Sequence, residues 1–166
     1  MLEKKFTKRL KGFGIKNLLL SPDTIISFIV FIAVGFLTGW TISSETGDNF
    51  INTIVPVSAA FFSIVLAALA IVSSFTDENF ILLWVRAGEF ENLVTLFQWN
   101  LYLPLVITVF ALFIEFVYYN SILLILLIAF FIYMVISLID LIKFISAYAL
   151  QRAEFIEMKY NESKPE

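Results

Sequence analysis

The sequence contains neither cysteine nor histidine. Without cysteine it forms no disulfide and offers no thiolate nucleophile, and without histidine it lacks the imidazole base and the commonest zinc and haem ligand. No motif for a carboxylate dyad, a serine activated by a base, or a phosphate-binding glycine loop replaces them. We therefore expect no catalytic residues, no cofactor and no metal site, and we predict that the chain is not an enzyme.

Charged residues are also scarce. They make up 15% of the 166 residues, and hydrophobic residues make up 60%, whereas soluble domains average about 25% charged and 45–50% apolar residues. The mean hydropathy is +0.92. Because a soluble chain of this size could not bury so much apolar surface, we predict an all-α integral membrane protein.

Four runs of about 20 residues are almost entirely apolar. A helix of this length crosses a hydrocarbon core of about 30 Å. These runs have no polar face, which argues against a soluble helical bundle. Ser21, Pro22 and Asp23 predict the start of the first helix, because serine caps a helix, proline fits its first position and an acid favours its first turn. The four predicted spans, within a transmembrane domain of residues 21–146, are 25–42, 54–72, 101–118 and 122–142.

A four-span topology leaves one side without any Lys or Arg, and all 11 of these residues fall on the other side. Arg86 lies between the second and third spans, and the others precede the first span or follow the fourth. Since Lys and Arg concentrate in cytoplasmic loops, we predict a plasma-membrane protein with both termini in the cytoplasm. The basic residues of the N-terminal arm, 1–20, are Lys4, Lys5, Lys8, Arg9, Lys11 and Lys16.

The N-terminal arm also has an apolar face, on which Leu2, Phe6, Leu10 and Phe13 recur at helical spacing between the lysines. This pattern suits an arm that lies on anionic lipid headgroups. Alternatively, the lysines only follow the preference of basic residues for the cytoplasmic side. We expect no nucleic-acid partner, because no aromatic-rich basic fold accompanies the arm.

The segment between the second and third spans predicts an amphipathic helical hairpin at the inner membrane face, residues 77–98. Thr76 is a suitable N-cap and Gly88 a suitable stop, which together predict one short helix. A second helix then places apolar residues from Phe90 to Phe97 on one face, with polar residues opposite. A segment that dips into the bilayer is disfavoured, because its carboxylates would enter hydrocarbon at several kcal/mol each.

The fourth span carries three further signals. No helix breaker follows it, so we expect the helix to continue into a cytosolic C-terminal helix and tail, 147–166. Asp140 and Lys143 lie at i and i+3, the spacing of an ordinary ion pair on a helix. Tyr133 lies near mid-span, so its hydroxyl is expected to find a partner within the bundle.

Small residues mark one face on each of the first two spans. Lipid tails give helices no hydrophobic reason to associate, so close approach at small residues has to supply the contact. These faces either pack on each other within the chain or join copies of the chain in a homo-oligomer. They consist of Gly35 and Gly39 on the first span, and Ala59, Ser63, Ala67 and Ala70 on the second.

Glu115 is the one carboxylate well inside a predicted span, and ionisable residues at such positions are functional candidates. Thr108 lies on the same predicted helix, and Thr38 and Ser58 lie at similar depth in theirs. We consider these four side chains a possible ion pathway. Alternatively, the Glu115 carboxylate only reaches the outer surface or accepts a structural hydrogen bond.

Two functions fit this layout. The first is a self-associating, channel-like or pore-forming assembly, because a small chain with small-residue helix faces and no soluble domain gains most from self-association. The alternative is a non-conducting scaffold or interaction subunit, which offers its cytosolic helices to a protein partner in a larger membrane complex. The sequence carries no motif that names an ion, a solute or a ligand.

Overall fold

The computed structural model describes residues 6, 8, 21–74 and 78–162. In this part of the chain the ordered elements are helices, without a strand, as expected for an all-α protein. Most of the basic N-terminal arm, including Lys4, Lys5, Arg9, Lys11 and Lys16, lies outside the described residues, and so does Thr76. The helices are α3 (Pro22–Thr38), α4 (Ser44–Ser74), α5 (Glu78–Ala87), α6 (Glu89–Phe116) and α7 (Ser121–Glu162).

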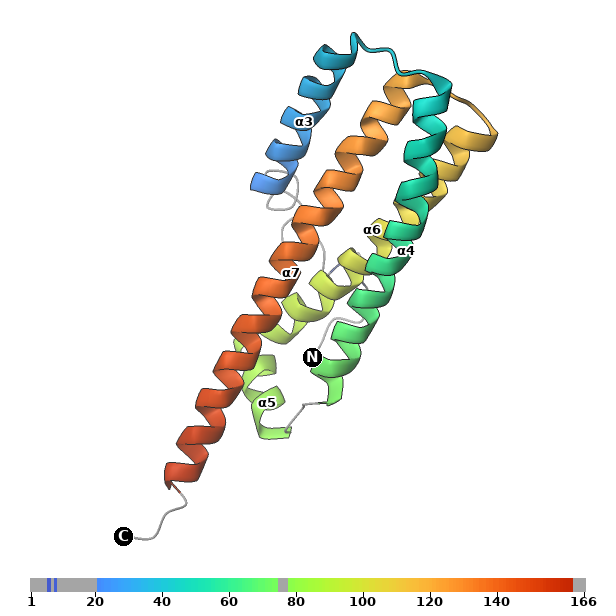
Figure 1. Ribbon diagram of the computed structural model, residues 1–166. Coiled ribbons are helices and arrows are strands. Elements are labelled where there is room, and N and C mark those ends of the chain that lie inside the picture. Colours follow the sequence, from blue (N-terminus) through green and yellow to red (C-terminus); the bar gives the residue numbers. More distant parts are fainter. Residues whose placement is uncertain (1–5, 7, 9–20, 75–77, 163–166) are drawn as a thin grey trace.

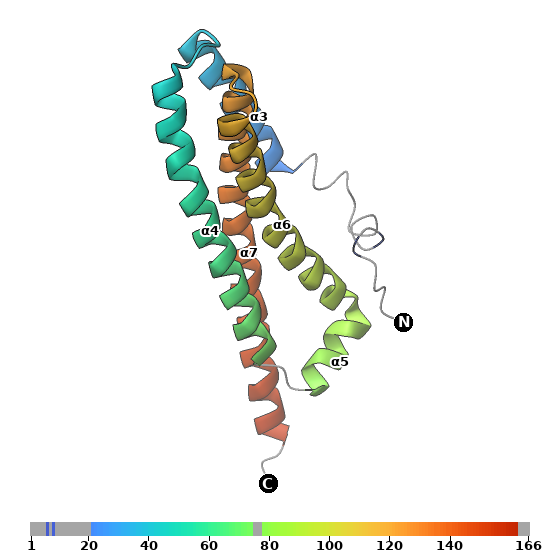
Figure 2. The same cartoon turned by 90° about the vertical axis from the view of Figure 1, so that its right-hand side faces the viewer.

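The helices form an elongated bundle with two different ends (Figure 1). The α3–α4 loop and the α6–α7 turn meet at one end, which we call the turn end. At the other end, the α5 end, α5 lies beside the bundle and α7 projects beyond it (Figure 2). α3 packs on α7, α4 on α6, and α6 on both α5 and α7. α7 is therefore the element that connects α3 to the rest of the bundle.

Three helices, α4, α6 and α7, are long and apolar enough to cross a membrane. α3 is also apolar, but it has 17 residues, which give a length of about 26 Å at 1.5 Å per residue. That length is slightly less than the hydrocarbon core of about 30 Å. The fold is thus that of a membrane-associated helical protein, with α3 as a shorter apolar helix.

α3 starts where the sequence predicts and ends earlier. The Ser21 hydroxyl accepts a hydrogen bond from the Thr24 N–H at 3.4 Å, and Pro22 lies in the first turn. Gly39 ends the helix in the left-handed conformation, with φ 59°. Because glycine has no Cβ, it adopts this conformation without steric cost. The predicted span 25–42 therefore extends too far at its C-terminal end.

α4 begins ahead of the predicted span 54–72. Ser43 caps it, since the Thr46 N–H donates to the Ser43 hydroxyl at 3.3 Å, and the helix runs from Ser44. Ile51 is completely buried in the bundle. The added turns are stable because they bury apolar side chains against the other helices, a gain that local sequence does not reveal.

α6 joins two elements that the sequence predicts as separate. The amphipathic stretch 89–98 and the span 101–118 form one continuous helix, which ends at Phe116. Leu93 and Phe97 are buried in a cluster with residues of α4 and α7. The apolar face of this stretch thus packs on protein, and its position at the inner membrane face stays a prediction.

α5 forms as predicted and lies beside the bundle, next to α7. It ends at Ala87, and the next residue, Gly88, adopts a positive φ of 78° and leads directly into α6. The Trp84 ring of α5 packs edge-on against two rings of α7, with centroid distances of 6.0 Å to Phe144 and 4.7 Å to Tyr148. This contact covers part of the apolar surface of α5, as its nearly uniform apolar sequence requires.

Hydrogen bonds fix the α3–α4 loop to the α6–α7 turn. The Tyr119 hydroxyl lies 3.0 Å from the carbonyl oxygen of Ile42 and 2.8 Å from that of Ser43. The Ser121 hydroxyl accepts a hydrogen bond from the Ile42 N–H at 3.1 Å. Gly47 permits this approach, because a Cβ at that position would lie 2.6 Å from the Tyr119 hydroxyl oxygen.

Two clusters of buried apolar side chains fill the space between α4, α6 and α7. One contains Ile54 and Ile107 and lies towards the turn end. The other contains Val65, Phe97 and Tyr148 and lies towards the α5 end. Neither cluster includes a described residue of α3, so α3 stands on the side of α7 and outside the main core.

Candidate functional site

Buried polar side chains join α6 to α7. Asn100 of α6 is 3% exposed. Its Oδ1 accepts a hydrogen bond from the Ser137 hydroxyl of α7 at 3.1 Å, and its Nδ2 donates to the Leu96 carbonyl at 3.0 Å. Because a buried polar group without a partner costs about 1–3 kcal/mol, this pair favours a single register of α6 on α7.

A second polar contact joins the same two helices. The Trp99 indole N–H donates a hydrogen bond to the Tyr133 hydroxyl at 3.2 Å. This confirms the expectation that Tyr133 has a partner inside the bundle. The donor is the residue next to Asn100, so two successive residues of α6 bond to α7.

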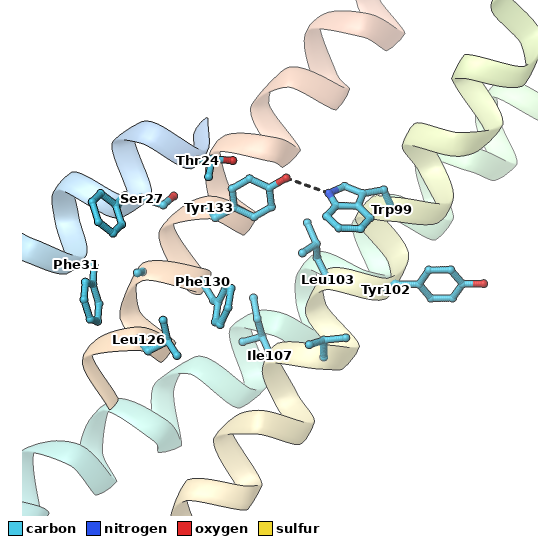
Figure 3. Close-up of a pocket in the computed structure, with 13 residues that line it drawn as sticks. Thr24, Ser27, Phe31, Trp99, Tyr102, Leu103, Ile107, Leu126, Phe130 and Tyr133 are labelled. Atoms are coloured by element: carbon cyan, nitrogen blue, oxygen red, sulfur yellow. Dashed lines mark hydrogen bonds between the residues drawn. The ribbon is translucent and has the colours of Figure 1, made fainter. Parts of the chain in front are cut away.

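An apolar cavity of about 480 Å³ lies between α3, α6 and α7 (Figure 3). α7 passes between α3 on one side and α6 on the other, and contributes Leu126 and Tyr133 to the lining. The polar groups of Thr24, Tyr133 and Trp99 lie at one end, and Phe31 and Leu126 lie at the other (Figure 3). The volume is within the range of about 300–1,000 Å³ that is typical of ligand pockets.

Three charged side chains gather where α3 begins beside α7. The Lys143 ammonium group donates to Asp140 Oδ1 at 2.9 Å, as their spacing predicts. Asp23 precedes the predicted first span; burial raises the pKa of its carboxyl group, and the charge of Asp140 raises it further. The hydrogen bond to Asp140 raises the pKa of Lys143, which follows the predicted fourth span. Two carboxylates thus share the neighbourhood of one ammonium group.

The four residues of the possible ion pathway lie on three helices, and no hydrogen bond joins any two of them. The Thr38 hydroxyl donates to the Val34 carbonyl and the Thr108 hydroxyl to the Pro104 carbonyl, both at 2.8 Å. Glu115 is exposed. Ser58 is fully buried, and its hydroxyl has no hydrogen-bond partner in the described part of the chain. A shared pathway for these side chains stays a prediction.

The two small-residue faces do not pack on each other within the chain. α3 packs on α7 and α4 packs on α6. Gly35 is covered by the Trp40 ring, to which a Cβ at Gly35 would approach within 2.6 Å, and Gly39 has nothing within 4 Å of its Cβ position. Contact between copies of the chain stays a prediction for the exposed residues of α4, which are Ala59, Ser63, Ala67 and Ala70.

Two residues of the N-terminal arm are described. The Phe6 ring packs edge-on against the Tyr102 ring of α6, with a centroid distance of 5.2 Å. Lys8 is exposed. The apolar face of the arm therefore contacts α6 through Phe6, and the predicted lipid contact of its lysines stays a prediction.

Sequence reasoning missed the Asn100–Ser137 pair and the cavity. Asn100 sits between the predicted interfacial helix and the third span, so it looks like a boundary residue. A signal was present: Leu93, Phe97, Asn100 and Pro104 recur at helical spacing, which continues the buried face of α6 across the predicted boundary. The cavity has no local sequence signal, because three helices contribute to it.

Comparisons with protein-family models, with curated proteins and with solved structures find no match to this chain. Within the described residues, no group of three acidic side chains is placed to hold a metal ion. The features of the described residues that bear on function are therefore the packing, the exposed surfaces and the cavity.

The Asn100–Ser137 bond leads to a test of stability. Asn100→Leu is expected to lower the free energy of unfolding, because the buried bond is lost and the Ser137 hydroxyl loses its acceptor. In a double-mutant cycle with Ser137→Ala, unfolding in mixed micelles should give a coupling free energy of about 1 kcal/mol, the usual scale for hydrogen bonds between membrane helices. Ser146→Ala, which removes a hydroxyl bonded within its own helix, is the uncoupled control. Strictly additive effects of Asn100→Leu and Ser137→Ala would contradict the assignment.

Proposed function

We propose that the protein is a non-conducting interaction subunit of a membrane complex, with four membrane-crossing helices and with both termini and α5 in the cytoplasm. The 17 residues of α3 lie at the short end of the range of about 17–25 that suits a crossing helix. The positions of the Lys and Arg residues support this orientation. In it, the turn end faces outside, and the α5 end and the last part of α7 face the cytoplasm.

The observation that carries the proposal is the length of α7. Its 42 residues give about 63 Å, roughly twice the thickness of the hydrocarbon core. The part beyond the predicted span carries large apolar side chains that are more than half exposed: Leu150 at 67%, Met158 at 59% and Tyr160 at 62%. Ile156 is 50% exposed.

Apolar side chains that project into water on a helix are typical of a protein-binding surface. Charged residues such as Glu154 and Glu157 alternate with them, which keeps the free helix soluble. A partner with an apolar groove is the complement of such a helix. The opposite side of the helix packs within the chain, because Tyr148 is buried against Trp84.

The orientation gives the first prediction of this proposal. The natural chain has no cysteine, so single cysteines report one position each. In intact cells, Ser44→Cys should react with an impermeant thiol reagent, and Glu157→Cys should react only after the membrane is opened. Both positions are exposed on the folded chain. Labelling of both from outside, or of neither, would overturn the orientation.

The interaction surface gives the second prediction. A photoreactive amino acid at Ile156 should cross-link, in native membranes, to one discrete protein that is not a copy of this chain. Ser44, exposed at the turn end, is the control position, and it should give no such product. A product of twice the chain mass would instead indicate self-association, and the absence of any product at Ile156 would contradict the proposal.

Self-assembly into a channel-like pore is the second candidate, and the exposed small-residue face of α4 favours it. Ala59, Ser63 and Ala67 leave backbone within reach of another helix, which is the feature that membrane helices use to associate. Glu115 is exposed near the turn end, and an oligomer would repeat it as a ring of carboxylates. Such rings attract cations and set selectivity in channels.

A flux assay tests the pore. If purified protein in liposomes forms a pore, Glu115→Gln should lower the preference for cations and leave the oligomer mass unchanged, because the amide keeps the shape and removes the charge. Glu45→Gln removes one exposed carboxylate from the same end and should change the preference less. A native mass of one chain, with no flux, would exclude the pore and leave the interaction subunit.

A further inference from the structure

The cavity between α3, α6 and α7, here called the lateral groove, is open at the side of the bundle. Two of its walls, α3 and α6, each pack on α7, and the groove of about 480 Å³ remains between them. Val106 lies in its lining and is 62% exposed. An apolar groove that is open at the side admits an apolar molecule from that side.

The lining residues indicate where the groove lies relative to the membrane. They belong to the predicted spans 25–42, 101–118 and 122–142 and to the residues just before them. On the membrane placement proposed above, on which this inference rests, the groove opens into hydrocarbon and not into water. Hydrocarbon chains are then the molecules available to fill it.

The polar end of the groove offers a hydrogen-bond donor. Tyr133 accepts the hydrogen bond from Trp99, and its own hydroxyl proton has no acceptor among the described residues. Figure 3 shows this hydroxyl at the same end as Thr24. An ester carbonyl oxygen at this end would complete the hydrogen bonding of Tyr133.

The charges beyond this end fit a headgroup with charges of both signs. Asp23 is next to Thr24 in the lining, and its charge acts on both Tyr133 and Lys143. Asp140 pairs with Lys143 at 2.9 Å, which leaves one carboxylate in excess. A primary ammonium group complements two carboxylates, and a phosphate group complements Lys143.

We infer that the lateral groove binds one acyl chain of an ethanolamine phospholipid. The chain lies between α3 and α6 on α7, the ester carbonyl lies at Tyr133, and the ammonium group lies at Asp23 and Asp140. A choline headgroup fits less well, because its quaternary nitrogen has no N–H to donate to these carboxylates. The lipid fills the space that the packing of α3 and α6 on α7 leaves between them.

Fluorescence quenching by brominated lipid tests this inference, because Trp99 lines the groove. The double variant Trp40→Phe, Trp84→Phe leaves Trp99 as the only tryptophan, since the chain has three. It is placed in phosphatidylcholine vesicles that contain a minor fraction of phosphatidylethanolamine brominated in the acyl chain. The reference protein has all three tryptophans changed to Phe and carries Val109→Trp, a position on α6 that is 67% exposed and outside the groove lining.

Trp99 should be quenched several-fold more than the tryptophan at 109, because the groove holds the brominated lipid above its bulk fraction. The excess quenching of Trp99 over the tryptophan at 109 should disappear with Val106→Phe, which fills the groove mouth. It should remain with Val109→Phe. Asp23→Asn with Asp140→Asn should reduce the excess to the level found with brominated phosphatidylcholine.

Three results would overturn the inference. Equal quenching of both tryptophans would show that both contact only the bulk lipid of the bilayer and that the groove binds none specifically. Weaker quenching of Trp99 would show that protein, such as the N-terminal arm or a second chain, fills the groove. The same excess with brominated phosphatidylcholine would refute the ethanolamine assignment. A failure of the membrane placement itself is distinguishable, because then neither tryptophan would be quenched by any brominated lipid.

Discussion

The packing of α7 against its neighbours is the interaction on which the rest of the structure depends. α3, α4 and α6 all pack on it, and Trp84 of α5 packs on its rings at Phe144 and Tyr148. In a bilayer the hydrophobic effect does not drive helices together, so a common partner with good packing has to do so. Asn100 and Ser137 add a buried hydrogen bond to this contact, where the loss of either group would leave the other without its partner.

The unequal support of the helices explains the shape of the surface. α4 and α6 are held on α7 by two buried clusters, whereas α3 is outside both and is fixed mainly by its contact with α7 and by the turn-end bonds of Tyr119 and Ser121. α3 therefore packs extensively on α7 alone among the described helices. The lateral groove follows directly from this one-sided packing.

Local signals in the sequence predicted the parts of the fold that local chemistry determines. The Ser21 cap, the Gly88 stop and the hydroxyl partner of Tyr133 are present as expected. The early start of α4 depends on the burial of Ile51, and the continuity of α6 depends on the burial of Phe97, in both cases against other helices. A local sequence pattern does not predict such contacts. The same holds for the candidate site: its residues come from three helices, and only their packing brings them together.

The charged residues at the start of α3 connect the lipid inference to the proposed function. Asp23, Asp140 and Lys143 all stand beside the polar end of the groove, and charges of this kind belong at the level of the headgroups. If the membrane boundary lies there, α7 leaves the bilayer near Lys143, and α5 and Tyr148 lie outside the hydrocarbon. The exposed side chains from Leu150 to Tyr160 then meet water or a protein, and not lipid. A lipid held in the groove would stabilise the packing of α3 on α7. It would thereby fix the membrane boundary near Lys143 and the position of the partner-binding part of α7 relative to the membrane.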